Sequence, residues 1–155
     1  MTHGKKILAV CYGAAHVEML LPLIEPLRLR HEVTLIGINT AAIVLREHGI
    51  AFTRVTDLVE TLGLTEEVNT WGRKALVSSP SPLSLSEAES IAYLGMNLRD
   101  LALQHGDDVA LGLYAERGRA VFHPMHFARQ LLRHLAPDLV LATSAPRLER
   151  AIVEA

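Results

Sequence analysis

Two nearly unbroken apolar segments constrain the fold of this chain more than any other feature of its sequence. The first covers residues 6–12 (KILAVCY) and the second covers residues 136–143 (APDLVLAT). An apolar run of this length is typical of a β-strand buried on both faces, as in a parallel sheet that is covered by helices on its two sides. The two segments therefore predict a layered α/β fold.

The residues between the first strand and position 55 alternate between helix and strand patterns. Two stretches have apolar residues at helical spacing, and two others are rich in β-branched side chains. The predicted elements are a helix over residues 16–30, a strand over 32–38, a helix over 40–47 that ends at Gly49, and a short strand over 50–55. A β-α-β-α-β order predicts a Rossmann-like, three-layer open parallel sheet with helices on both faces.

The central part of the chain changes in character. Residues 77–86 (VSSPSPLSLS) are rich in Ser and Pro and have no apolar periodicity, which predicts a loop. Ser86 and Glu89 form a capping-box pattern, which opens a helix that runs through Leu101. Further helices are expected over residues 107–117, over 124–135 and from 144 to the C-terminus.

We expect residues 1–155 to form a single Rossmann-like domain. The last helical pattern runs to Ala155 without a Gly or Asn to end it. A sheet that still has an open edge is also an unusual place for a chain to stop. We therefore expect a truncated chain that is the N-terminal half of a two-domain protein.

Composition and charge argue against several classes of function. The chain has 15 Lys and Arg against 17 Asp and Glu, so no basic stripe for nucleic acid is expected. Cys11 is the only cysteine, which excludes an internal disulfide and a cysteine-cluster metal site and fits a cytoplasmic location. No apolar segment is long enough to span a bilayer, so we expect membrane contact to be at most peripheral. We also expect no metal site.

The turn after the first strand is the strongest candidate for a functional site. A dinucleotide-binding turn needs the pattern GxGxxG, and only Gly13 fits it, because Ala14 and Ala15 carry Cβ atoms. His16 instead lies at the predicted helix N-terminus and at the carboxyl edge of the sheet, where open α/β folds bind ligands. Two interpretations remain open at this point. Either His16 is a neutral base that accepts a proton from a hydroxyl, or it only caps the helix.

The same segment resembles a known family. Residues 10–27 (VCYGAAHVEMLLPLIEPL) are similar to the strand-loop-helix opening of GT-B glycosyltransferases, in which small and glycine-rich residues precede a Gly-His pair, a Pro and a Leu-rich helix. Residues 135–143 (LAPDLVLAT) are similar to the PDxV strand of the same N-terminal half. Residues 144–150 (SAPRLER) resemble the segment that follows this strand in a subgroup near sugar-nucleotide epimerases and capsule-sugar transferases.

The resemblance implies an acceptor-binding domain. In GT-B enzymes the N-terminal domain holds the acceptor, which would be a sugar or a lipid-linked molecule. A C-terminal domain, in cis or as a separate subunit, binds the nucleotide sugar, which is a co-substrate, so no cofactor is expected. His16 inherits the role of general base or acceptor contact. The substrate-binding positions that the match implies are Gly13, Ala14, Ala15, Ser144, Arg147 and Arg150.

Two further pairs of residues are candidates from their spacing alone. Tyr93 and Asn97 are four residues apart, so they share a face of the predicted helix and are placed to meet a sugar hydroxyl. Arg147 and Arg150 are three apart near a predicted helix start. They form either a clamp for a phosphate or carboxylate, or a solvated face that is paired with nearby glutamates.

Three functions remain open from the sequence. The first is the acceptor-binding half of a glycosyltransferase, which accounts for both His16 and the PDxV strand. The second is half of a sugar-nucleotide epimerase or hydrolase, and the third is a stand-alone flavodoxin-like module that binds a ligand without chemistry. Fold alone does not separate transfer from epimerisation, because the chemistry is decided by the site.

Overall fold

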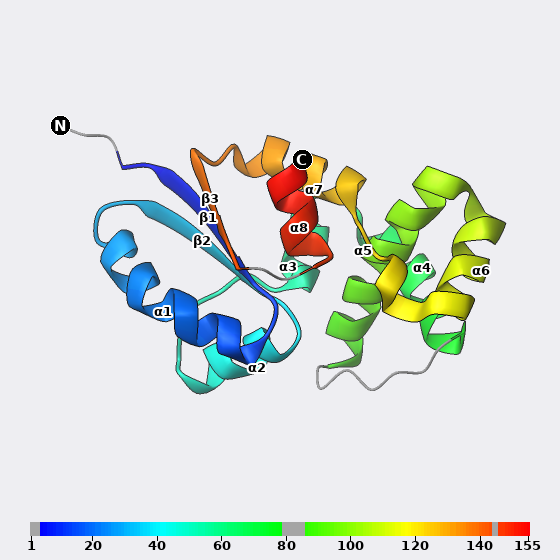
Figure 1. Ribbon diagram of the computed structural model, residues 1–155, viewed down its shortest axis with the longest axis horizontal. Helices are drawn as coiled ribbons and strands as arrows, with labels where there is room; N and C mark the ends of the chain where they lie inside the picture. Colours follow the sequence, from blue (N-terminus) through cyan, green and yellow to red (C-terminus); the bar gives the residue numbers. More distant parts are fainter. Residues whose placement is uncertain (1–3, 79–85, 144–145) are drawn as a thin grey trace.

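The computed structural model describes residues 4–78, 86–143 and 146–155. The strands are β1 (Lys6–Cys11), β2 (Glu32–Gly37) and β3 (Leu139–Ala142). The helices are α1 (Ala14–Arg28), α2 (Thr40–Glu47), α3 (Val55–Thr61), α4 (Thr65–Ser78), α5 (Glu87–His105), α6 (Asp107–Arg117), the short 3-10 helix η1 (Gly118–Val121), α7 (Met125–Leu135) and α8 (Leu148–Glu154). Figure 1 shows two lobes, one with the strands, α1 and α2, and one built from α4, α5 and α6, with α7 and α8 between them.

The three strands form one parallel sheet in the order β2-β1-β3. In the centre of the sheet, Leu8 of β1 pairs with Thr34 of β2 on one side and with Val140 of β3 on the other. The chain moves outward from β1 to β2 and later returns to the opposite side of β1 with β3. This reversal creates a topological switch point between the carboxyl ends of β1 and β3, which is where open α/β sheets bind ligands.

Both faces of the sheet are covered, as the unbroken apolar run in β1 requires. Ala9 and Cys11 pack into a core with α1 and α2. Leu8 and Val10 point to the other face and join a larger core with α3, α5, α7 and α8. The predicted open parallel sheet with helices on both faces is confirmed.

The contact between α4 and α5 in the helical lobe depends on two glycines. A Cβ atom built on Gly95 of α5 would overlap the backbone carbonyl oxygen of Val68 in α4. A Cβ atom on Gly72 of α4 would likewise overlap the carbonyl oxygen of Ile91 in α5. The two helices therefore touch through their backbones, and only glycine permits this separation.

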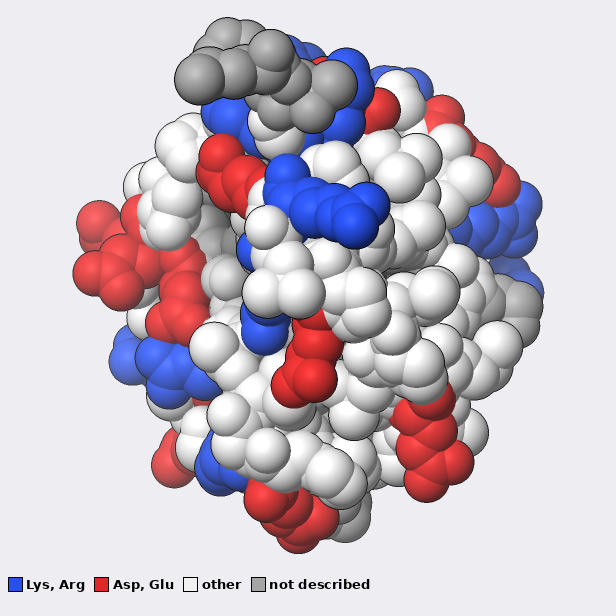
Figure 2. Space-filling view, turned by 90° about the vertical axis from the view of Figure 1, so that its left-hand side faces the viewer, with Lys and Arg blue, Asp and Glu red and all other residues white. Residues whose placement is uncertain are grey.

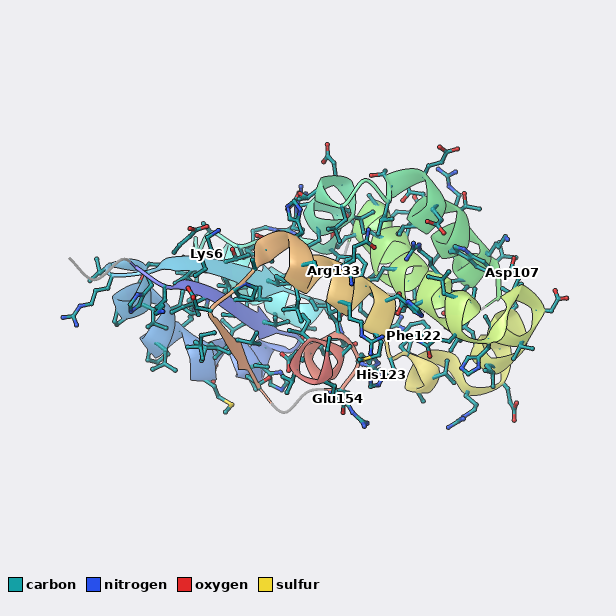
Figure 3. All side chains as sticks on the ribbon, turned by 90° about the horizontal axis from the view of Figure 1, so that it is seen from above. Lys6, Asp107, Phe122, His123, Arg133 and Glu154 are labelled. Atoms are coloured by element: carbon teal, nitrogen blue, oxygen red, sulfur yellow. The ribbon has the colours of Figure 1, made fainter. Side chains whose placement is uncertain are left out.

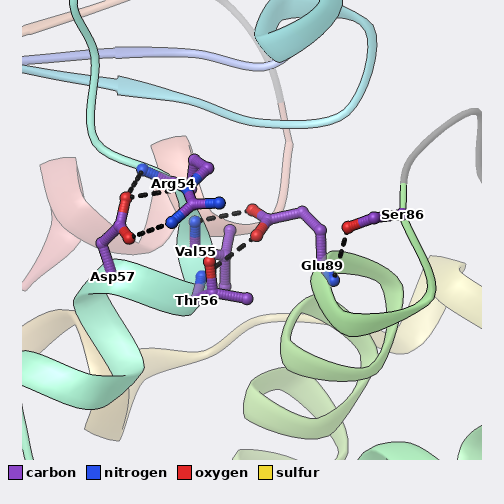
Figure 4. Close-up of polar contacts among 6 residues, drawn as sticks. All are labelled: Arg54, Val55, Thr56, Asp57, Ser86 and Glu89. Atoms are coloured by element: carbon purple, nitrogen blue, oxygen red, sulfur yellow. Dashed lines mark hydrogen bonds and ion pairs between the residues drawn. The ribbon is translucent and has the colours of Figure 1, made fainter.

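Two buried acidic side chains of α5 bind the N-termini of neighbouring helices. The Glu89 carboxylate accepts hydrogen bonds from two N–H groups at the start of α3, at 2.7 and 3.2 Å (Figure 4). Asp100 accepts two from the start of α7, at 2.7 and 3.0 Å. The two acids are eleven residues apart, which is about three helical turns, so they lie on the same side of α5. The N–H groups that they accept from are among those that a helix leaves unpaired at its first turn.

The predicted capping box at the start of α5 forms only in part. The Ser86 hydroxyl accepts a hydrogen bond from the Glu89 N–H group at 3.3 Å, as the pattern predicts. The Glu89 carboxylate, however, turns to α3 (Figure 4). Of the predicted Ser/Pro loop, residues 77 and 78 belong to the end of α4, and residues 79–85 lie outside the described residues.

Several predicted boundaries are corrected by the structure. The short strand expected over residues 50–55 is wrong, because only Thr53 pairs, in an isolated bridge with Ile36. Residues 55–78 instead supply α3 and α4, which the sequence did not predict. The second apolar segment forms only the four residues of β3, at the edge of the sheet. Its Leu139 is 49% exposed, so this strand is not buried on both faces.

Candidate functional site

Side chains that are far apart in the sequence meet at the carboxyl ends of β1 and β3. His16 lies in the first turn of α1, just after β1, and Thr143 directly follows β3. The Thr143 Oγ1 and His16 Nδ1 atoms are 2.8 Å apart. The pair therefore lies at the topological switch point, on the edge of the sheet where the sequence predicted His16.

A buried glutamate completes this arrangement. The Glu149 side chain is 1% exposed, and its two carboxylate oxygens accept the Thr143 hydroxyl at 3.1 and 2.9 Å. Its Oε1 atom lies 3.8 Å from His16 Nδ1, and the His16 side chain is 26% exposed. We call His16, Thr143 and Glu149 the His-Thr-Glu relay. It runs from a buried carboxylate to an imidazole that reaches the surface.

The chemistry of the three groups determines the direction of these hydrogen bonds. An ionised carboxylate only accepts, so the Thr143 proton points to Glu149 and the Thr143 oxygen accepts from the Nδ1–H group of His16. In the neutral form of His16 with this bond, the lone pair is on Nε2. This tautomer is assigned from the hydrogen-bond network, and it is the form that a general base requires.

The Glu149 charge also acts on Cys11, the last residue of β1. Burial raises the pKa of the Cys11 thiol to about 12, and the Glu149 carboxylate adds to this increase. The Cys11 Sγ atom lies 3.5 Å from the carbonyl oxygen of Ile36. A thiol with so high a pKa is not a nucleophile at neutral pH, so Cys11 is part of the core next to the relay.

A second group of polar side chains lies where the two lobes meet. The Arg147 guanidinium lies over the Tyr12 ring, 5.1 Å from its centroid, and the Tyr12 and Tyr93 ring centroids are 6.2 Å apart. The Nε atom of Arg147 donates a hydrogen bond to the carbonyl oxygen of Arg119 at 3.2 Å. We call Tyr12, Tyr93, Arg119 and Arg147 the Arg-Tyr cluster. In Figure 3, Phe122, which follows η1, lies at this junction of the lobes.

The predicted residues of the turn after β1 are tied into the protein. Gly13 precedes α1, and its carbonyl oxygen accepts the His16 N–H group at 3.0 Å. The Ala14 N–H group donates to the Thr40 Oγ1 atom at 3.1 Å. The Ala14 and Ala15 side chains are exposed in the first turn of α1. The N–H groups of Ala14 and His16 are thus already engaged by the protein itself.

The structure separates the two predicted arginines. Arg147 precedes α8 and lies in the Arg-Tyr cluster, whereas Arg150 donates from Nε to Glu154 at 2.6 Å on the exposed side of α8. They therefore do not share a helical face. Figure 3 shows Glu154 at the end of α8, beside His123, to which it is bonded at 3.1 Å. Ser144 lies outside the described residues.

Tyr93 and Asn97 share a face of α5, as their spacing predicts, but that face is buried. Each side chain is 1% exposed. The Asn97 Nδ2 atom donates to the Tyr93 carbonyl oxygen at 2.8 Å, within the helix. Of this pair, the structure brings Tyr93 to the Arg-Tyr cluster, and Asn97 lies one helical turn further along α5.

Sequence reasoning missed most of the partners in both groups. Thr143 was predicted only as the end of a strand, although a hydroxyl at the carboxyl end of a parallel strand is itself a signal. Glu149 was treated as a surface partner for arginine, because nothing in the local pattern shows that it is buried. Tyr12 and Arg119 were not identified, since their meeting depends on how the helical lobe packs.

No family model, curated protein or solved structure matches this chain. Among residues 4–78, 86–143 and 146–155, no three His, Cys, Asp or Glu side chains gather as metal ligands. None of the helices in the described part of the chain is long and apolar enough to cross a membrane. Figure 2 shows Lys, Arg, Asp and Glu interspersed on one face of the protein, without a region of one sign.

Proposed function

We propose that this chain is the acceptor-binding domain of a glycosyltransferase, in which His16 deprotonates the acceptor hydroxyl. The His-Thr-Glu relay carries the proposal, because it holds the His16 imidazole at the switch point between β1 and β3. The acceptor is a sugar or a lipid-linked molecule. The donor is a nucleotide sugar, bound by a C-terminal domain in cis or by a separate subunit, so that this chain corresponds to the N-terminal half of a GT-B fold.

The relay suits the proton transfer that glycosyl transfer requires. The acceptor oxygen forms a bond to the anomeric carbon, the bond from that carbon to the nucleoside diphosphate breaks, and the hydroxyl proton moves to His16 Nε2. The imidazolium that results lies 3.8 Å from the Glu149 carboxylate, measured from Nδ1 to Oε1. Because Glu149 is buried, this attraction is stronger than it would be in water.

The turn after β1 supports placing the donor elsewhere. A turn that binds pyrophosphate directs free backbone N–H groups to the phosphate oxygens. Here the Ala14 N–H group is bonded to Thr40, and the N–H groups of His16 and Val17 point to the Gly13 carbonyl oxygen. These residues therefore suit an acceptor contact better than a nucleotide contact.

The test measures nucleoside diphosphate release by the complete gene product from a panel of nucleotide sugars, with free sugars and polyprenyl phosphates as acceptors. His16→Ala and His16→Gln should each lower turnover by about 10²–10⁴-fold, the usual contribution of a general base. His48→Ala is the matched control. His48 is an exposed histidine at the end of α2, whose Nδ1 atom contacts only the Val44 carbonyl oxygen in its own helix. It should leave turnover unchanged.

Thr143→Val tests whether His16 acts as a general base or only caps helix α1. It removes the hydroxyl that links His16 to Glu149 and keeps the shape of the side chain. Turnover per folded molecule should fall, and the melting temperature should fall as well, because the buried Glu149 carboxylate loses a hydrogen bond. A histidine that only caps the helix would lose stability and keep its turnover per folded molecule. Full turnover in folded His16→Ala would contradict the proposal and favour a flavodoxin-like ligand-binding module. Release of an epimerised or hydrolysed sugar without transfer would assign the chain to a sugar-nucleotide epimerase or hydrolase.

A further inference from the structure

We propose that the Arg-Tyr cluster binds a phosphoryl group, and that this group belongs to the acceptor whose hydroxyl meets His16. The first half of this statement stands on the cluster itself. The second half, which names the acceptor, rests on the proposed function. The site would make the acceptor a phosphorylated sugar or a lipid-linked phosphate.

The cluster contains buried polar atoms that no described residue satisfies. The Tyr93 hydroxyl lies close to that of Tyr12 but makes no hydrogen bond of good geometry with the described residues, although the side chain is only 1% exposed. The Nη2 atom of Arg119 is also buried without a partner in this part of the chain. Buried polar groups are hydrogen-bonded in the great majority of cases, and each exception needs an explanation. Two buried donors with spare hydrogen-bonding capacity in one cluster suit a polar ligand.

The charge of the cluster indicates that this ligand is an anion. None of the ion pairs among the described residues includes Arg119 or Arg147, whereas the nearby Arg150 is paired with Glu154. Arg147 is held by the Tyr12 ring and by the Arg119 carbonyl oxygen, which engages Nε. The two terminal nitrogens of a guanidinium are further donors that suit bidentate contact with an oxyanion.

The two tyrosine hydroxyls add donors to these charges. Burial raises the pKa of Tyr93, and the neighbouring Tyr12 raises it further, so that Tyr93 stays protonated at neutral pH. The charges of Arg147 and Arg119 partly oppose this increase, because both lie near the Tyr93 hydroxyl. Polar groups from the residue after β1, from α5, from η1 and from the start of α8 thus come together in the Arg-Tyr cluster. A phosphoryl group, with three or more oxygens, uses more of them than a carboxylate does.

The backbone of Arg147 is strained. Its φ angle is +68°, a conformation that a bulky side chain rarely adopts. Residues held in this way cluster at ligand sites, where the surrounding contacts fix the side chain before the ligand binds. Here those contacts are the Tyr12 ring and the Arg119 carbonyl oxygen.

The cluster and the relay are built from the same two segments. Tyr12 and His16 lie four residues apart at the carboxyl end of β1, and Arg147 and Glu149 both lie at the start of α8. We therefore place one ligand across both groups, with its phosphoryl group at the arginines and its hydroxyl at His16.

The test titrates the chain by calorimetry with inorganic phosphate, a hexose 1-phosphate, a polyprenyl phosphate in micelles, and malonate as a carboxylate. Phosphate and at least one phosphorylated molecule should bind saturably and more tightly than malonate. Arg147→Gln and Arg119→Gln should each weaken phosphate binding by about tenfold or more, because each removes a charge-assisted bond. Arg150→Gln is the matched control and should change affinity by less than about twofold, because Arg150 pairs with Glu154 outside the cluster.

Tyr93→Phe tests the site with little change to the fold, because it removes only a hydroxyl that makes no hydrogen bond of good geometry with the described residues. Phosphate binding should weaken by about threefold or more, with the melting temperature kept or raised. Tighter binding of the hexose phosphate identifies a soluble acceptor, and tighter binding of the polyprenyl phosphate identifies a lipid-linked one. Absence of saturable phosphate binding, malonate bound equally well, or affinity unchanged in Arg147→Gln, Arg119→Gln and Tyr93→Phe would each overturn the inference.

His16→Ala separates this inference from the proposed function. Phosphate binding should survive this substitution, because His16 is not part of the Arg-Tyr cluster. If His16→Ala loses turnover but the wild type binds no phosphate, the general base is supported and the phosphoryl site is contradicted. If the wild type binds phosphate but His16→Ala keeps full turnover, the phosphoryl site is supported and the general base is contradicted.

Discussion

Gly95→Ala should destabilise this protein, because α4 and α5 touch through their backbones at this position. A Cβ atom on Gly95 would overlap the Val68 carbonyl oxygen, and it would lie 2.8 Å from the Val68 carbonyl carbon and 2.9 Å from the Gly72 nitrogen. Non-bonded carbon atoms pack at about 3.5–4.0 Å, so the two helices must separate locally by about 0.7 Å or more. The obstacle is the backbone of α4, which cannot rotate away as a side chain would.

The magnitude follows from two opposing effects. Overpacking of a core typically costs about 1–3 kcal/mol. Alanine recovers about 1 kcal/mol of helix propensity relative to glycine. Because rigid backbone must move, we expect the upper end of the packing cost and a net loss of about 2 kcal/mol. For a chain of this size, that loss lowers the melting temperature by about 4–8 °C.

Gly112→Ala is the matched control within the same lobe. Gly112 lies in α6, and a Cβ atom on it would have nothing within 4 Å. The same substitution should therefore stabilise the protein by about 0.5–1 kcal/mol through helix propensity alone. Scanning calorimetry and urea unfolding measure both variants. Equal melting temperatures for the two, or a rise in Gly95→Ala, would refute the backbone contact between α4 and α5.

Two further predictions concern buried ionisable groups. Burial raises the pKa of Asp100 above its ordinary value of 3.8, so its carboxylate ionises less readily in the folded than in the unfolded chain. Its contribution to stability is therefore fullest at acid pH and falls as the pH rises through the raised pKa. The stability difference between the wild type and Asp100→Ala, from urea unfolding, should be larger at pH 4 than at pH 7, and the opposite trend would contradict this sign. Cys11, with a pKa of about 12 and a fully buried side chain, should react with a disulfide reagent at pH 8 far more slowly than free glutathione does, since only about one molecule in 10⁴ carries the thiolate. Labelling of the native protein at the rate of glutathione would show that Cys11 is accessible.

The accuracy of sequence-based prediction differed between the two halves of the sheet for a physical reason. The run over residues 6–12 was predicted as a strand buried on both faces, and β1 is such a strand, because it lies in the centre of the sheet and helices cover both of its faces. The run over residues 136–143 carries a similar signal, yet β3 forms the edge of the sheet and Leu139 is half exposed. The apolar composition of a segment indicates that the segment is suited to burial. It does not indicate whether the segment lies in the centre or at the edge of a sheet.

The strand expected over residues 50–55 gives way to α3 at its last residue, Val55, where a distant side chain binds. The N–H groups of Val55 and Thr56 are bound by the carboxylate of Glu89, which starts α3 at the position where the pattern predicted strand. Glu89 lies more than thirty residues away in the sequence, and its capping-box pattern predicts a bond within its own helix. A contact of that kind depends on tertiary packing and cannot be predicted from the residues around Val55 alone.

The sequence by itself determined the α/β class, the central strand and the position of His16, because these depend on local periodicity and on the turn that follows a buried strand. The partners of His16 were decided by the tertiary structure. Val10 of β1 pairs with Ala142 of β3, and this parallel register brings the residues after both strands to the same edge, where Thr143 meets His16. Glu149 joins them because α8 packs on β3. A local sequence pattern indicates which face of a segment is buried. A site built from three segments depends in addition on which strands pair, and that is decided by long-range contacts.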